Sequence, residues 1–153
     1  MLNRLKSLLN RPAQPDVPGQ PEEIRMAAAA LLVEAAEMDG LMDMKERDHI
    51  LDLLRGRFDL TAAEAEDLLA EAADRSAQTH QLLPFTRVIK DRFGHEQRVE
   101  MLEMLWEVAY ADGHLHDYEA NLVRRIGGLL FVSDKESGGA RNRAMARLGV
   151  SED

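Results

Sequence analysis

Apolar residues recur along most of this chain every three or four positions, which is the spacing of one face of an α-helix. The first of these stripes joins Ile24 to Met38 and stops at the Asp39-Gly40 pair. Further stripes predict helices at about residues 44–55, 61–72, 84–93, 95–111 and 122–130, with a last helix after residue 133. No segment alternates apolar and polar residues as a half-buried strand does. The pattern therefore predicts an all-α fold, a compact bundle of about seven helices.

Several helix ends are marked by local signals. Thr61 is followed three residues later by Glu64, and Ser133 by Glu136, which is the pattern of a capping box. The segment at 95–111 is apolar on several sides and is expected to lie at the centre of the core, with Trp106 as core filler. The glycines at 138–139 each lower helix propensity by about 1 kcal/mol relative to alanine, so the last helix is expected to be weak.

The first 21 residues differ from the rest and predict a separate segment. Leucines at helical spacing alternate with Arg4 and Lys6 in residues 1–10, and four prolines follow by residue 21. We therefore divide the chain into a short amphipathic segment with a proline-rich tether, 1–21, and a helical domain, 22–153. Residues 1–11 suit peripheral contact with a membrane or a partner groove. The alternative is a frayed terminus, because ten residues form only a marginal helix in water.

The charge of the chain excludes some classes of partner. The 153 residues carry a net charge of −9; residues 1–21 contribute +2, so the remainder stands at −9 − 2 = −11. Such a surface repels phosphate, and nucleic-acid binding is not expected. Basic protein partners and cations are favoured instead. No run of about 18 apolar residues predicts a membrane span, and the lack of cysteine fits a cytoplasmic location.

The two halves of the helical domain resemble each other when one is shifted by 73 residues. The Asp39-Gly40 pair then falls on Asp112-Gly113, and Phe58 falls on Phe131. With a further shift of one residue, the two predicted capping boxes also coincide. The repeated unit is a helix, an Asp-Gly turn, a second helix, a phenylalanine and a capped helix, which indicates an internal duplication.

The repeated motif Ala-x-x-Asp-Gly-x-apolar-x-x-x-Glu, at residues 36–46 and 109–119, resembles the tellurite-resistance TerB-like family. The resemblance covers roughly residues 24–148. It implies a compact seven-helix domain associated with tellurite and general chemical stress, and a related domain accompanies J-domain co-chaperones at the inner membrane. An acidic patch at the Asp-Gly turns has been suggested to hold a divalent cation in this family. The resemblance implies no enzymatic activity.

Any metal site is expected at these two acidic turns. The candidate ligands are Asp39, Asp43, Glu46, Asp112, His116, Asp117 and Glu119. Their spacing matches the second half of an EF-hand loop, but the first half is missing, which argues against a standard calcium site. Hard oxygen ligands suit Mg²⁺ or Ca²⁺, and His116, alone or with His114, would favour a transition metal.

A purely structural interpretation of the same turns remains open. Each glycine can end a helix in the left-handed conformation. Asp43 can then cap the next helix with Glu46 as its capping-box partner, and His116 or Asp117 can do the same with Glu119. This interpretation does not require Asp39 or Asp112 to be acidic, and an aspartate at a helix C-terminus is mildly unfavourable. The repetition of that aspartate keeps the cation hypothesis open.

The sequence favours a non-enzymatic binding module over an enzyme. It contains no Gly-rich phosphate loop, no nucleophile elbow and no His-Glu-x-x-His motif. Glu34 and Glu107 suggest a carboxylate di-metal site, but the companion Glu-x-x-His pairs are missing. We expect a module for stress or metal-ion physiology that binds a divalent cation or a basic protein. The alternative is a membrane-tethered adaptor or co-chaperone-like domain that uses residues 1–11.

Overall fold

The computed structural model describes residues 21–37, 42–79, 81–111, 115 and 117–150. Within them the chain forms seven α-helices and no strand, which confirms the predicted fold class. The helices are α2 (Pro21–Ala36), α3 (Met44–Phe58), α4 (Ala62–Thr79), α5 (Leu83–Arg92), α6 (His95–Ala109), α7 (Asp117–Leu129) and α8 (Asp134–Leu148). None of these helices combines the length and hydropathy that a bilayer crossing needs. The predicted amphipathic segment and tether lie almost wholly outside the described residues, so their role stays a prediction.

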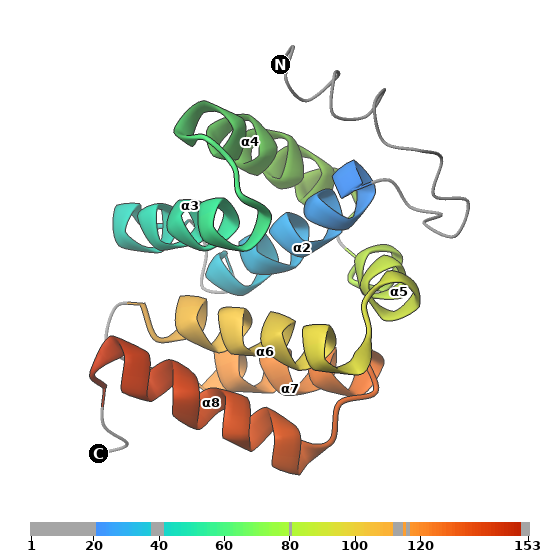
Figure 1. Cartoon of the computed structure of the whole chain (residues 1–153), viewed down its shortest axis with the longest axis vertical. Coiled ribbons are helices and arrows are strands. Elements are labelled where there is room, and N and C mark those ends of the chain that lie inside the picture. Colours follow the sequence, from blue (N-terminus) through green and yellow to red (C-terminus); the bar gives the residue numbers. More distant parts are fainter. Residues whose placement is uncertain (1–20, 38–41, 80, 112–114, 116, 151–153) are drawn as a thin grey trace.

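Two helices, α2 and α6, form the centre of the bundle (Figure 1). Helix α2 packs against α3, α4, α5, α6 and α7, and α6 also packs against α7 and α8. The sequence predicted one apolar stripe on α2, but every residue from Met26 to Val33 is buried. The alanines at 27–30 explain the difference, because their small side chains let neighbouring helices approach α2 from several sides. The expected central position of α6 is confirmed.

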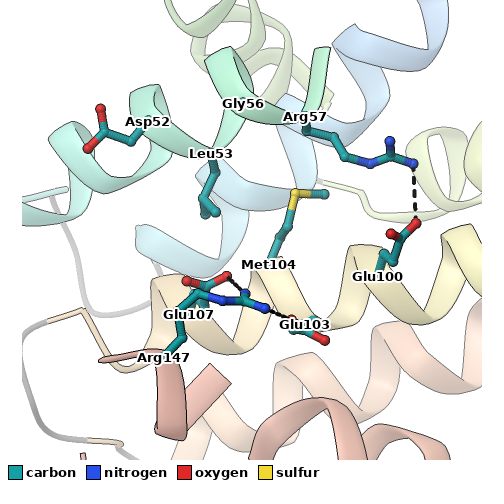
Figure 2. Close-up of a pocket in the computed structure, with 9 residues that line it drawn as sticks. All are labelled: Asp52, Leu53, Gly56, Arg57, Glu100, Glu103, Met104, Glu107 and Arg147. Carbon is teal, nitrogen blue, oxygen red and sulfur yellow. Dashed lines mark hydrogen bonds and ion pairs between the residues drawn. The ribbon is translucent and has the colours of Figure 1, made fainter. Parts of the chain in front are cut away.

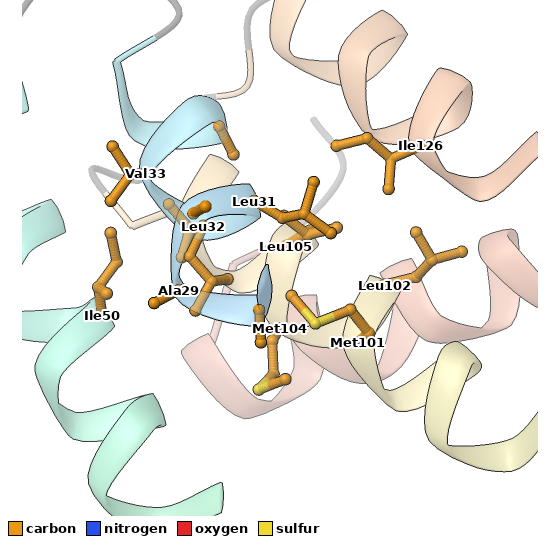
Figure 3. Packing of buried hydrophobic residues seen from close by; sticks show 14 of the residues in the cluster. Ala29, Leu31, Leu32, Val33, Ile50, Met101, Leu102, Met104, Leu105 and Ile126 are labelled. Carbon is orange, nitrogen blue, oxygen red and sulfur yellow. The ribbon is translucent and has the colours of Figure 1, made fainter. Parts of the chain in front are cut away.

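The core lies where these two helices meet (Figure 3). Leu31 and Leu32 of α2 and Leu105 of α6 are completely buried, and Trp106 is almost so. Burying a large apolar side chain of this kind contributes about 1.5–3 kcal/mol, so this contact supplies much of the driving force for folding.

Three helices begin with the reciprocal hydrogen bonds of a capping box. The pairs are Asp43/Glu46 for α3, Thr61/Glu64 for α4 and Ser133/Glu136 for α8. Each pair satisfies two backbone N–H groups, one through each side chain, that would otherwise lack a partner at a helix start. All three had been predicted from the sequence, because the signal lies within four consecutive residues.

Helix α8 runs unbroken through Gly138 and Gly139 and packs along α6. Its propensity alone predicted a weaker element. The difference arises from tertiary contacts, because Ser137, Ala140 and Ala144 are buried. Packing of this kind outweighs the roughly 1 kcal/mol cost of each glycine.

The α3–α4 and α7–α8 junctions share one backbone conformation. Asp59 (φ 54°) and Phe131 (φ 58°) are both left-handed. The next residue in each case donates its N–H to the carbonyl five residues earlier, at 3.1 Å for Leu60 and 2.9 Å for Val132. Phe131 therefore corresponds structurally to Asp59 and not to Phe58, and the one-residue shift between the halves lies before Phe131. The internal duplication itself stays a prediction.

Candidate functional site

The two predicted acidic turns flank helix ends that lie on the same side of the bundle. Helices α2 and α6 both end there and α3 and α7 both begin there, at the left of the view in Figure 1. Three of the candidate ligands, Asp39, Asp112 and His116, lie outside the described residues. The others stand at the starts of α3 and α7: Asp43, Glu46, Asp117 and Glu119.

Asp43 and Glu46 bind each other's backbone. The Glu46 N–H donates to Asp43 Oδ1 at 2.7 Å, and the Asp43 N–H donates to Glu46 Oε1 at 3.1 Å. The capping interpretation is therefore confirmed for this pair. A carboxylate offers about four lone-pair positions, so one cap hydrogen bond does not exhaust either side chain.

Glu119 occupies the same place in α7 as Glu46 does in α3, the third residue of the helix. Both carboxylates are buried, whereas Asp43 and Asp117 are exposed. Negative charge at a helix start is stabilised by the helix dipole. Among the described residues, no three acidic or histidine side chains converge as metal ligands. Any cation site at this end would therefore need the aspartates of the turns.

Glu34 and Glu107 each accept a hydrogen bond from a different neighbour. Glu34 accepts a hydrogen bond from the buried Ser76 hydroxyl of α4. Glu107 accepts one from Arg147 of α8, at 2.7 Å. Burial raises the pKa of nearby Glu37, and the negative charge of Glu34 raises it further. These hydrogen bonds account for the acidic residues at positions 34 and 107.

A ladder of ion pairs fastens α8 to α6. Arg143 Nε donates to Glu103 at 2.7 Å, and Arg147 bridges Glu103 and Glu107. Burial alone would raise the pKa of Glu103, but the hydrogen bonds from Arg143 and Arg147 outweigh it and the pKa is lowered. This ladder was not predicted from the sequence. The available signal was the matching four-residue spacing of two glutamates on one helix and two arginines on another.

Beside the ladder lies a cleft of about 280 Å³ between α3 and α6 (Figure 2). Its lining residues are Asp52, Leu53, Gly56, Arg57, Glu100, Glu103, Met104, Glu107 and Arg147. Leu53 and Met104 form an apolar centre, and Arg57 pairs with Glu100 at 3.5 Å on one side. Because Arg143 and Arg147 lower the pKa of Glu103, this carboxylate suits ion pairing and not proton donation at neutral pH.

Most of this chain matches the model of a known protein family. Residues 25–142 match the family model described as tellurite resistance protein TerB. Searches of curated proteins and of solved structures found no similar chain. The match spans all or part of every described helix and includes both Asp-Gly turns. This chain therefore belongs to the tellurite resistance protein TerB family.

Proposed function

We propose that this chain is a non-enzymatic binding module that takes up a divalent cation, Mg²⁺ or Ca²⁺, at the end of the bundle where α3 and α7 begin. The observation that carries this proposal is the placement of two buried carboxylates, Glu46 and Glu119, at equivalent positions of helices that start on the same side. The sequence adds one aspartate before each start, Asp39 and Asp112. Oxygen-rich sites of this kind select hard divalent cations.

The ends of α2 and α6 support a cation at this position. The C-terminal end of a helix carries a partial negative charge, which attracts cations. Two such ends lie on this side of the molecule, after Ala36 and Ala109. The TerB family connects the chain with tellurite resistance. We place its role in the response to chemical stress or in metal-ion physiology.

Thermal unfolding with and without metal tests the proposal. We expect millimolar Mg²⁺ or Ca²⁺ to raise the Tm of the wild-type chain, because a ligand of the folded state stabilises it by about 2.7 kcal/mol at a hundred times its Kd. The double variant Asp39→Asn/Asp112→Asn should lose this shift. Asp67→Asn is the matched control, since Asp67 is an exposed aspartate of α4 outside both turns. It should keep the full shift.

Calorimetric titration with a chelator control gives the affinity directly. An unchanged Tm at millimolar metal would leave the turns as helix caps only. A shift that survives in the double variant would place the ion elsewhere. In the first case the net charge of −9 favours a basic protein as the occupant of the acidic turns.

A further inference from the structure

The turn between α7 and α8 exposes a phenylalanine in an unusual backbone conformation. Phe131 has φ 58°, and 67% of its surface is exposed. Glycine or asparagine usually occupies this position after a helix, and a bulky side chain with positive φ is an outlier. Backbone strain of this kind is concentrated at functional sites. The folding of the turn does not account for an exposed aromatic residue here, which points to a binding role.

Phe131 continues a row of side chains along α5 that are exposed or half-buried. The Lys90 ammonium lies 5.1 Å from the centre of the Phe131 ring. Leu83 and Arg87, both exposed, precede Lys90 by seven and three residues and so lie on the same helix face. These three residues span about 10 Å of helix. We call Leu83, Arg87, Lys90 and Phe131 the α5 face.

The two apolar members of the α5 face stand at corners of the fold. Phe131 occupies the turn that joins α7 to α8, and Leu83 begins α5. Two cations, Arg87 and Lys90, lie between them along the row. Exposed apolar side chains at corners of the fold, with cations between them, suit contact with a negatively charged surface. A peptide would instead require a concave groove on the protein.

The charge around the α5 face differs from that of the rest of the chain. Hydrogen bonds from Arg98 to the Leu130 carbonyl (3.0 Å) and between His95 and Glu136 hold residues 83–98 beside residues 129–136. The cations of these two segments are Arg87, Lys90, Arg92, Arg98 and Lys135, and the anions are Asp91, Glu96, Asp134 and Glu136. Their sum is 5 − 4 = +1, so the remainder of the chain stands at −9 − 1 = −10. The α5 face itself carries two cations and no anion, which suits an anionic surface.

We infer that the α5 face docks on an anionic membrane surface. Phe131 and Leu83 enter the headgroup region, while Arg87 and Lys90 bind lipid phosphates. This inference does not depend on the proposed cation site, which belongs to the other end of α7.

Flotation of the full chain with lipid vesicles tests the inference. The probes are phosphatidylcholine vesicles with roughly a third phosphatidylglycerol, and vesicles of phosphatidylcholine alone. We expect the wild-type chain to float only with the anionic vesicles and to be released at about 0.5 M salt. Arg87→Gln/Lys90→Gln should lower the partition coefficient about five-fold for each cation removed. Phe131→Gly should also lower it, while circular dichroism and the Tm show that it still folds.

Matched controls lie near the start of α3. Met44 is 68% exposed, about as much as Phe131, and Lys45 is an exposed cation next to it. Met44→Ala and Lys45→Gln should float like the wild-type chain. The inference is overturned if the wild-type chain does not float with anionic vesicles. It is also overturned if the α5-face variants float like wild type, including the case in which only Leu5→Glu/Leu8→Glu abolishes binding.

Discussion

Replacing Glu107 with alanine should lower the free energy of unfolding by about 2–3 kcal/mol. Glu107 is 2% exposed and accepts a hydrogen bond from Arg147 at 2.7 Å, while His49 Nε2 lies 3.5 Å away. A hydrogen bond to a charged group contributes about 1.5–3 kcal/mol, and the one buried methylene that the substitution removes adds about 0.8 kcal/mol. Relief of the desolvated carboxylate offsets part of this sum. Arg147 is half exposed and keeps Glu103, so its remaining charge is solvated.

Thermal and urea unfolding measure this loss. In a chain of this length each kcal/mol shifts the Tm by about 2–4 °C, so we expect a decrease of roughly 5–10 °C. Glu100→Ala is the matched control, because Glu100 lies on the same helix and lines the same cleft but is 58% exposed. Its ion pair with Arg57 should contribute less than about 1 kcal/mol. Equal effects of the two substitutions would refute the reasoning that burial determines the strength of the Glu107 contact.

Two further predictions concern the last two helices. Hydrogen bonds from His95 and from Ser133 lower the pKa of Glu136 to about 2. The contribution of Glu136 to stability should therefore be complete above its unfolded-state pKa of about 4.3. It should disappear as the pH falls toward 2. An NMR titration of the carboxyl group should show this value, and a higher one in His95→Ala; the same pKa in both would contradict the assignment. Gly128→Ala should raise the free energy of unfolding by up to about 1 kcal/mol, and with it the Tm, because nothing lies within 4 Å of its new Cβ. Gly127→Ala should be the less stable of the two, since its Cβ would meet the buried Leu102 Cδ1 at 3.1 Å, and the opposite order would show that Leu102 can move aside.

The local features of this fold could be predicted from the sequence, because their partners lie within one turn of helix. The Asp43/Glu46 and Ser133/Glu136 caps are of this kind. The burial of α2 on all sides was not predicted, because a run of alanines does not reveal how many helices pack around it. Whether such a feature can be predicted from the sequence therefore depends on whether the contacts that form it are local or tertiary.

The contacts near the candidate sites were the least predictable. Glu107 and Arg147 are 40 residues apart, and the matching spacing of glutamates and arginines does not by itself show that α8 lies along α6. The pairing of Phe58 with Phe131 followed residue identity, whereas the backbone aligns Phe131 with Asp59. Residue type therefore misled the alignment at this position, and the duplication itself stays a prediction. The Phe131 ring is the exposed aromatic group on which the membrane inference rests.

The enclosure of α2 has a consequence for how the protein is made. This helix precedes all of its packing partners in the sequence, and they extend as far as α7. A nascent chain therefore leaves the ribosome with an apolar helix that nothing can yet cover. Its final neighbours arrive only after about a hundred more residues have been synthesised, at roughly 5–20 residues per second. Until then α2 exposes apolar surface, and slow translation would prolong the time in which that surface can aggregate.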